Sequence, residues 1–243
     1  MDSATMAAVA VALVVACSMQ AVTGFGFALV AMPLLALAVG AHDAVAVASL
    51  VGTVGSFLLL ARYRHQVRWN LVWPALVGAL LGMPLGLYVL LVVDEKFLRL
   101  AIAATVLVSV AALASGRQLP QGSRLLDVVA GFISGVLNTS VSTNGPPLVL
   151  SLHARGLDPD AFRGTISALF AASAVVGDCL FAATGRYTPT VLLYAALGPF
   201  ALLVGRWAGQ VAAPYLTVRR FRFAVLATLG LASCSAVLSV VVG

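Results

Sequence analysis

Two polar interruptions inside long apolar stretches are the features of this sequence that could do chemistry. The first stretch covers residues 6–39 and is interrupted at residues 20–26 by Gln-Ala-Val-Thr-Gly-Phe-Gly. The second covers residues 125–152 and is interrupted at residues 138–147 by Asn-Thr-Ser-Val-Ser-Thr-Asn-Gly-Pro-Pro. The two interruptions occupy corresponding places in the two halves of the chain, a pattern typical of the binding site of a secondary transporter.

The second interruption has the chemistry to bind an anion without a charged side chain. Gly145 permits unusual backbone angles, and Pro146 and Pro147, which lack amide hydrogens, can begin a helix. Thr143 or Asn144 could cap that helix, whose N-terminus would carry a partial positive charge. Free amides, hydroxyl groups and a helix N-terminus together suit a small oxyanion with several acceptor oxygens.

We expect the substrate to bind between the two interruptions. The candidate substrate-binding residues are glycines and residues with hydroxyl, amide or aromatic side chains: Gln20, Thr23, Gly24, Phe25, Gly26, Asn138, Thr139, Ser142, Thr143, Asn144 and Gly145. The alternative is that these small residues only let helices pack closely in a membrane. Two Asn and four Ser or Thr within residues 138–147 exceed what close packing requires, whereas the first interruption offers only Gln20 and Thr23 as clear hydrogen-bonding side chains.

Two ionisable residues near the apolar spans could couple or steer transport. Asp178 lies in an apolar run, about one turn from its end, where it could carry protons or lie at the membrane interface. Arg163 lies just before that run, where it could attract anions or anchor the topology. The sequence contains no Ser-His-Asp arrangement, phosphate-binding glycine loop or cluster of metal ligands, so we expect no enzyme activity, metal or cofactor.

The composition indicates an integral membrane protein built from helices. The chain of 243 residues is 62% hydrophobic and 9% charged, whereas a soluble domain has about 25% charged residues. Its apolar runs are continuous, as in membrane helices, while barrel strands alternate over about ten residues. The net charge of +6 fits Lys and Arg in short cytoplasmic loops better than nucleic-acid binding. We therefore expect a multi-pass protein of the cell (inner) membrane.

The chain divides into two repeats, each an interrupted stretch followed by three uninterrupted spans. The expected spans cover residues 44–61, 71–93, 97–114, 165–183, 190–212 and 221–242. Similar motifs relate the halves: Pro33 aligns with Pro147, and Gly82 and Gly86 align with Gly205 and Gly209. We expect repeats over residues 1–117 and 123–243, which together form one transmembrane domain.

The interrupted stretches decide whether these repeats are parallel or inverted. If each stretch crosses the membrane once, the eight crossings form parallel 4+4 repeats. Six Lys and Arg residues then lie on one side of the membrane and eight on the other. If each is a re-entrant hairpin, eleven lie on one side and only Lys96, Arg99 and Arg186 on the other. Because Lys and Arg are enriched on the inner side of membranes, we expect hairpins, inverted repeats and both termini outside.

Both halves resemble the TauE/SafE family of sulfite and organosulfonate exporters. The matching motifs flank the two interruptions: Thr-Gly-Phe-Gly at 23–26, Ala-Leu-Val at 28–30, Pro33, Gly-Phe-Ile-Ser-Gly at 131–135, Asn-Gly-Pro-Pro-Leu-Val at 144–149 and Phe-Arg at 162–163. The second interruption is rich in Asn, Ser and Thr, where many family members have glycines. The resemblance covers essentially the whole chain and implies export of sulfur oxyanions.

The expected function is a secondary transporter that exports a small anion, sulfite or an organosulfonate, by alternating access. An inside-negative potential of 100 mV favours the exit of one negative charge by about 2.3 kcal/mol, so export needs little coupling. The alternatives are an anion channel and a proton-coupled importer of a small organic anion, for which Asp178 is the available ionisable group. The expected partners are the anion and the lipid bilayer, and the sequence is compatible with a homo-oligomer.

Overall fold

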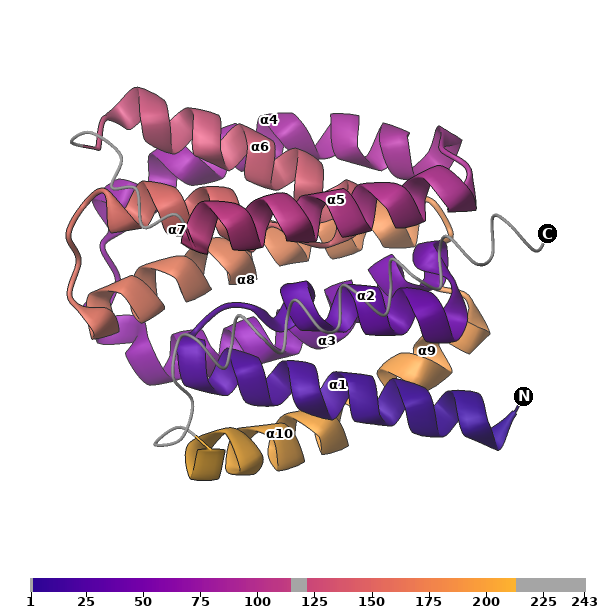
Figure 1. Cartoon of the computed structure of the whole chain (residues 1–243). Coiled ribbons are helices and arrows are strands. Elements are labelled where there is room, and N and C mark those ends of the chain that lie inside the picture. The colour runs from indigo at the N-terminus through magenta and orange to yellow at the C-terminus, as the bar shows by residue number, and fades with distance from the viewer. Residues whose placement is uncertain (1, 115–121, 213–243) are drawn as a thin grey trace.

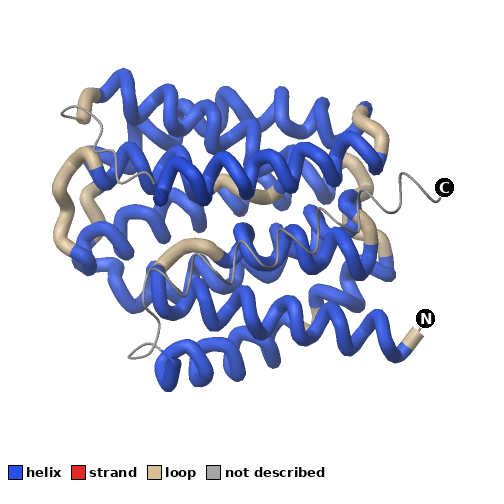
Figure 2. Tube along the Cα trace, viewed as in Figure 1, coloured by secondary structure: helices blue, strands red, loops and turns tan. Residues whose placement is uncertain are grey.

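The computed structural model describes residues 2–114 and 122–212, all of whose regular elements are helices (Figures 1 and 2). The first half contains α1 (Ser3–Thr23), α2 (Phe27–Val39), α3 (Ala41–Tyr63), the short 3-10 helix η1 (Arg64–Gln66), α4 (Trp69–Val92) and α5 (Glu95–Ala114). The second half contains α6 (Arg124–Val141), α7 (Gly145–His153), α8 (Pro159–Ala183), α9 (Pro189–Ala195) and α10 (Gly198–Ala212). The expected span 221–242 lies outside the described residues.

Side-chain caps mark where several helices begin. Asp2, Ser123, Asp158 and Thr188 each precede a helix, and their side-chain oxygens accept hydrogen bonds from amides of its first turn. Such caps satisfy amide groups that have no partner within the helix. The polar residues between the apolar runs therefore define the helix starts of α1, α6, α8 and α9.

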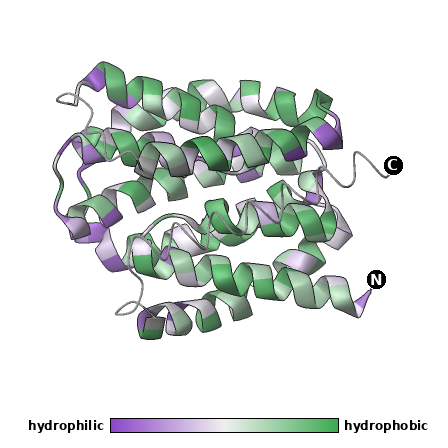
Figure 3. Ribbon diagram, in the orientation of Figure 1, coloured by the Kyte–Doolittle hydropathy of each residue, from purple (hydrophilic) through white to green (hydrophobic). Residues whose placement is uncertain are grey.

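Within the described ranges, six helical segments are long and apolar enough to cross a membrane. They are Ser3–Thr23, Ala41–Gln66, Trp69–Val92, Arg124–Val141, Pro159–Ala183 and Pro189–Val211. Figure 3 shows hydrophilic residues gathered at the two ends of the helices, while the flanks between them are largely hydrophobic. Large apolar side chains such as Trp73, Val108 and Leu203 are exposed on those flanks. The expectation of an all-helical integral membrane protein is confirmed for the described residues.

The expected span 190–212 is not one continuous helix. Helix α9 ends at Ala195 and α10 begins at Gly198, with a turn between them. Pro199 follows immediately, and its ring would collide with the carbonyl of residue 195 in a continuous helix. The expected spans 44–61, 71–93, 97–114 and 165–183 lie within α3, α4, α5 and α8, except for the last residue of the second.

Glycines let α4 lie in direct contact with α6. A Cβ atom at Gly78, Gly82 or Gly86 would lie 2.0, 2.2 or 2.1 Å from a backbone oxygen of α6. Gly131 and Gly135 on α6 are equally close to backbone oxygens of α4. Because any side chain would push the backbones apart, these five glycines fix the distance between the two helices.

The other half of the molecule uses the same packing. A Cβ atom at Gly205 on α10 would lie 2.5 Å from Cys17 Cβ, and one at Gly209 would lie 2.7 Å from the carbonyl oxygen of Ser18 on α1. In each half a glycine-bearing helix therefore packs against the first helix of the other half. Helices α3 and α8 pack against each other between these two pairs.

The chain reverses direction after α1 and again after α6. Helix α2 packs beside α1, and α7 packs beside α6. Figure 1 shows α1 starting at the end of the bundle that carries the N-terminus, whereas α6 starts at the opposite end. The two polar interruptions are the turns of these helix pairs (Figure 2).

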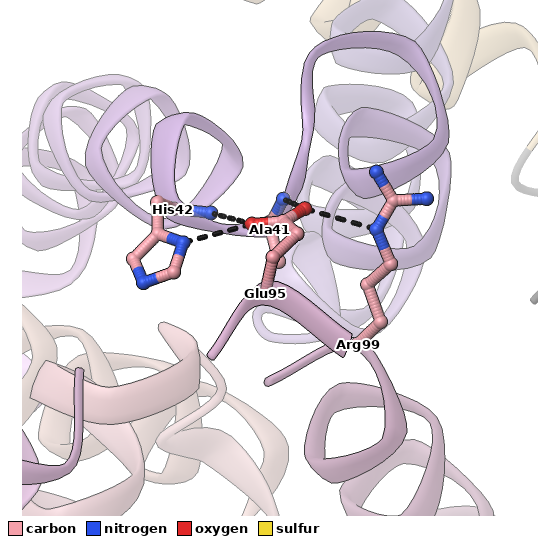
Figure 4. A network of polar contacts seen from close by, with 4 residues as sticks. All are labelled: Ala41, His42, Glu95 and Arg99. Atoms are coloured by element: carbon pink, nitrogen blue, oxygen red, sulfur yellow. Dashed lines mark hydrogen bonds and ion pairs between the residues drawn. The ribbon is translucent and has the colours of Figure 1, made fainter. Parts of the chain in front are cut away.

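Each helix pair is tied at its base by a carboxylate. Glu95 at the start of α5 accepts hydrogen bonds from the Ala41 amide, from Arg99 Nε and from the His42 amide, and its Oε2 lies 2.8 Å from His42 Nδ1 (Figure 4). Asp127, only 1% exposed, binds Arg155 and accepts a 2.6 Å hydrogen bond from the Ser151 hydroxyl. The first contact fixes the junction of α2 and α3, and the second fixes the base of α6 and α7.

Candidate functional site

The two interruptions line one cavity in the interior of the helix bundle, which we call the break cavity. Its volume is about 50 Å³. Most of the candidate binding residues line it: Gln20, Phe25, Gly26, Asn138, Ser142, Thr143, Asn144 and Gly145. Segments separated by more than a hundred residues in the sequence therefore meet at one place, and the remaining wall is supplied by α2, α3 and α8.

The first interruption is shaped by two glycines in the left-handed region. Gly24 has φ 84° and Gly26 has φ 89°, conformations that L side chains rarely adopt. They let the chain leave α1 and start α2 within three residues. Gly26 and the first turn of α2, Phe27 to Leu29, line the break cavity. The N-terminal amides of α2, which have no partner within the helix, are thus placed at the cavity wall.

The second interruption places a second helix N-terminus at the same cavity. Ser142 turns the chain with φ 51°, and α7 then begins at Gly145, followed by Pro146 and Pro147. Asn144 and Gly145 line the break cavity. Pro at the first positions of a helix is compatible with its missing amide hydrogen, so the predicted start of α7 is where the structure has it.

The predicted cap of α7 by Thr143 or Asn144 is wrong. Asn144 occupies the capping position, but its side chain forms no capping hydrogen bond, and the Thr143 hydroxyl donates instead to the Val141 carbonyl at 3.0 Å. The backbone of Asn144 is close to helical, with φ −86° and ψ −9°, whereas a capping residue is normally extended. The Ser134 hydroxyl instead holds the turn through a 2.8 Å hydrogen bond to the Asn144 carbonyl.

Three candidate residues do not line the cavity. The Thr23 hydroxyl is used inside its own turn, where it contacts the Met19 carbonyl at 2.9 Å and accepts from the Phe25 amide. Gly24 faces the stem of Arg163, whose Cγ would lie 2.9 Å from an added Cβ. Thr139 donates to the Met83 carbonyl of α4 at 2.6 Å. These residues shape the turns and the helix packing around the cavity.

Two amide side chains occupy equivalent positions at the cavity. Gln20 lies three residues before the end of α1, and Asn138 lies three residues before the end of α6. This equivalence shifts the halves by about one helical turn from the alignment of Pro33 with Pro147. The element positions explain the shift, because Pro147 lies in the first turn of α7 while Pro33 lies in the middle of α2.

Sequence reasoning missed a polar stripe on α3. Ser49, Gly52, Thr53 and Ser56 all line the break cavity. Their spacing of three, four and seven residues places them on one face of a helix. The signal was present in the sequence as small and hydroxyl residues at helical spacing within an apolar run, the pattern that marks a face turned away from lipid.

Asp178 is connected to the cavity through that stripe. Its carboxylate accepts hydrogen bonds from the hydroxyls of Ser49 at 2.5 Å, Thr53 at 2.7 Å and Tyr187 at 2.7 Å. These contacts place the carboxylate between α3 and α8, where it is half-buried. The side chain therefore lies behind the wall of the break cavity, held by two of its lining residues.

Arg163 lies beside the first interruption and outside the break cavity. Its guanidinium donates to the Val22 carbonyl at 3.4 Å, pairs with Asp160 at 3.3 Å and lies 5.8 Å from the centre of the Tyr63 ring. Its aliphatic stem covers Gly24. Arg163 lines a neighbouring cavity together with Gln20, so it is placed beside the candidate site.

The arrangement in the break cavity suits an anion. Two helix N-termini, three hydroxyl-bearing residues of α3 and three amide side chains face it, and none of its lining residues is charged. Helix N-termini attract anions through their free amides and their dipoles. At α7 the dipole contributes most, because Pro146 and Pro147 have no amide hydrogen. The pattern of donors without fixed charge is that of sites that bind and release small oxyanions.

Comparison with known proteins agrees with this chemistry. No curated protein and no solved structure gives a significant match to the chain. A family model described as sulfite exporter TauE/SafE matches residues 8–236, nearly the whole chain and both helix pairs. The resemblance noted in the motifs is confirmed, and the chain belongs to the sulfite exporter TauE/SafE family.

Proposed function

We propose that this protein exports sulfite or an organosulfonate by alternating access, with the anion held in the break cavity. Membership of the family makes the chain a membrane transporter of sulfite or related anions. The observation that carries the rest of the proposal is the convergence of two helix N-termini, those of α2 and α7, on one uncharged polar cavity. Both dipoles favour a bound anion, and neither holds it as tightly as a buried ion pair would.

The size of the cavity supports a small substrate. A cavity needs about 10–15 Å³ to hold one water molecule. The 50 Å³ of the break cavity therefore accommodates an ion of about four heavy atoms. Sulfite has four. The amide groups of Gln20, Asn138 and Asn144 and the free amides at the start of α2 offer enough donors for three acceptor oxygens. The α3 hydroxyls already donate to Asp178 or to the Gly52 carbonyl. A larger sulfonate would project its organic group toward Phe25 or Phe170, which also line the cavity.

The helix packing supports two inverted repeats as the moving parts. In this proposal α1–α2 and α6–α7 are hairpins that enter and leave the membrane from opposite faces. Helix α4 of the first repeat packs on α6, and α10 of the second repeat packs on α1, so each repeat packs directly against the hairpin of the other. Rocking of one set against the other would then open the break cavity to each side in turn.

Asp178 favours a second candidate, proton-coupled transport of an organic anion. Its carboxylate holds the Ser49 and Thr53 hydroxyls that line the break cavity, so its protonation would reorient two donors at the substrate. Export does not require this step, since an inside-negative potential already expels an anion by about 2.3 kcal/mol per charge at 100 mV. The two candidates therefore differ in their driving force.

The test is flux from proteoliposomes that contain the purified full chain. Liposomes loaded with sulfite, methanesulfonate, chloride or acetate are given a defined voltage or pH gradient, and efflux is followed with labelled anion. We expect saturable efflux of sulfite or methanesulfonate, driven by voltage alone and exceeding that of chloride. Accumulation that requires a proton gradient would establish the second candidate. Unitary currents in a planar bilayer would instead show an anion channel.

A further inference from the structure

A second cavity, next to the break cavity, is lined by three arginines. It has a volume of about 280 Å³, and its walls include Arg62 at the end of α3, Arg163 near the start of α8 and Arg206 on α10. We call it the arginine cavity. Gln20 lines both cavities. The arginine cavity is thus several times larger than the break cavity and shares the Gln20 side chain with it.

The positive charge of this cavity is poorly balanced. Arg163 pairs with Asp160 at 3.3 Å, but among the described residues neither Arg62 nor Arg206 forms an ion pair. The remaining residues of the sequence contain no Asp or Glu that could supply one. Arg62 and Arg163 also share the Tyr63 ring, at 5.5 and 5.8 Å from its centre. Like charges are thus held around one space.

Gln20 lines both cavities, and Gly55 lines the arginine cavity beside it. A Cβ atom at Gly55 would lie 2.6 Å from Gln20 Oε1, so a side chain at position 55 would displace this amide. Gln20 is only 6% exposed. Its side chain has rotatable bonds and forms no hydrogen bond to another described residue, so an ion on either side can become its partner.

We propose that the arginine cavity is the entrance site where a small oxyanion binds before it passes Gln20 into the break cavity. Arg62 and Arg206 are exposed, and positive charges that line one cavity raise the local concentration of anions. Planar guanidinium groups also match the oxygen pairs of sulfite, sulfonate and phosphate groups. This inference rests on the proposed function for the identity of the ion, but the binding of an oxyanion in the cavity can be tested without transport.

The location of the cavity agrees with export. Its arginines lie at the end of the bundle that carries the α3–α4 link, where the Arg68 amide donates to Thr165 Oγ1 at the start of α8. Arg64 and Arg155 lie in the links at this end as well. Under the positive-inside rule this end faces the cytoplasm. An exported anion would therefore meet the arginine cavity first.

Neutralising the two unpaired arginines tests the entrance role. In the proteoliposome assay we expect Arg62→Gln with Arg206→Gln to raise the half-saturating sulfite concentration about tenfold, in line with electrostatic focusing in charged clefts. The matched control is Arg64→Gln, which removes an exposed charge from the same end but not from the cavity wall. Arg62→Lys with Arg206→Lys keeps the charge and should restore most of the affinity. An unchanged half-saturating concentration, or an equal rise in Arg64→Gln, would overturn the proposal.

A second measurement separates this proposal from the transport function. Cys17, Cys179 and Cys234 are replaced by alanine, Gln210 in the cavity wall is replaced by cysteine, and its reaction with anionic and cationic methanethiosulfonates is timed. We expect the anionic reagent to react roughly tenfold faster, with a ratio near one after Arg62→Gln and Arg206→Gln. Added methanesulfonate should slow the reaction. A ratio near one before those changes refutes the entrance site, even if sulfite is transported.

The same reaction identifies the source of the bound oxyanion, because a lipid phosphate has similar chemistry. It is run in vesicles of phosphatidylcholine alone and with added phosphatidylglycerol. If methanesulfonate protects the cysteine at position 210 in both kinds of vesicle, the cavity is an entrance for a free anion. Protection by phosphatidylglycerol without any effect of methanesulfonate shows a lipid site and contradicts the proposal. Protection by methanesulfonate in a chain that moves no sulfite would refute the transport function while the anion site remains.

Discussion

At the scale of single residues, Asp178 is the group whose role depends on the transport mechanism. It accepts three hydroxyl hydrogen bonds and is joined to the break cavity through Ser49 and Thr53. If export is driven by voltage alone, its negative charge only orients those hydroxyls. If transport is coupled, its proton moves with the substrate. The two roles predict different effects of pH.

Asp178→Asn distinguishes these roles. For methanesulfonate, which stays ionised across the accessible pH range, voltage-driven export predicts the same relative pH dependence of efflux in the variant and in the wild type. The flux itself should fall a fewfold, because the amide cannot accept all three hydrogen bonds. The measurement is initial efflux at fixed voltage between pH 5 and 8. Loss of proton-driven accumulation in the variant would contradict uncoupled export.

Gly24→Ala tests the turn after α1. Gly24 has φ 84°, and an added Cβ would lie 2.9 Å from Arg163 Cγ. The matched control is Gly156→Ala, at φ 62° with nothing within 4 Å. Both changes introduce left-handed strain of about 1–2 kcal/mol, but only the first also displaces Arg163. We expect a lower thermal midpoint for both purified variants, with the larger decrease for Gly24→Ala. Equal decreases would show that the contact with Arg163 does not contribute to stability.

At the scale of elements, the contact around Glu95 holds the α2–α3 junction to α5. Burial opposes ionisation of this carboxyl, but hydrogen bonds from the Ala41 amide, Arg99 and His42 outweigh it and lower its pKa from 4.5 to about 2. A carboxyl whose pKa is lowered by folding stabilises the protein above its ordinary pKa. That stabilisation is lost as the pH falls from about 4.5 toward 2.

Glu95→Gln should therefore lower the thermal midpoint at pH 7 and flatten its decline on acidification. The effect is expected to be modest, since the side chain is 41% exposed and surface ion pairs are weak. Thermal unfolding of the purified protein between pH 3 and 7 measures it. Lys96→Gln, at the exposed neighbouring position, is the control. An identical acid decline in wild type and Glu95→Gln would show that this carboxylate does not tie α5 to the junction.

The sequence predicted the helix boundaries that depend on the residues at the boundary itself. It missed features that depend on contacts with residues farther along the chain. The glycines and prolines of the two interruptions predicted where α1, α2, α6 and α7 meet, because backbone freedom and missing amides act locally. The break between α9 and α10 was missed, although Pro199 was its signal. The predicted cap by Thr143 or Asn144 was wrong because the backbone of Asn144 is close to helical, in a turn that Ser134, ten residues earlier, holds through the Asn144 carbonyl. The residues next to Asn144 in the sequence do not predict the hydrogen bond from Ser134.

Part of the candidate binding site could also be predicted from the sequence. Polar residues in apolar surroundings pointed to both interruptions, and most of those residues line one cavity. Thr139 has the same residue type as Thr143 but faces α4, because α6 turns its hydroxyl toward Met83. The wall from α3 and the arginine cavity required the fold, since Arg62, Arg163 and Arg206 are far apart in the sequence and meet only when α3, α8 and α10 are assembled.

At the scale of the whole molecule, the proposed inverted topology assigns a side to each end of the bundle. His65 in η1 and Lys96 in the first turn of α5 are both exposed and lie at opposite ends of the bundle. In cysteine-free chains with His65→Cys or Lys96→Cys, a membrane-impermeant maleimide applied to intact cells should label only position 96. Labelling of position 65 requires disrupted cells. Labelling of position 65 from outside would contradict the assignment of the arginine-rich end to the cytoplasm.

The whole-molecule account depends on one claim, that an anion is held jointly by both interruptions. Gln20 comes from the first helix pair and Asn144 from the second, and both line the break cavity. A hydrogen bond to a charged group contributes about 1.5–3 kcal/mol, so loss of either amide should weaken binding about tenfold or more. Thr184, exposed at the far end of α8, offers a control outside the cavity.

The most direct test is the dissociation constant of sulfite for the purified protein, measured by calorimetry for Gln20→Ala, Asn144→Ala and Thr184→Ala. The account predicts wild-type affinity in Thr184→Ala and weaker binding in each of the other two. Their combination should bind no better than either alone. Wild-type affinity in Gln20→Ala or in Asn144→Ala would contradict the claim that the two interruptions form one anion site.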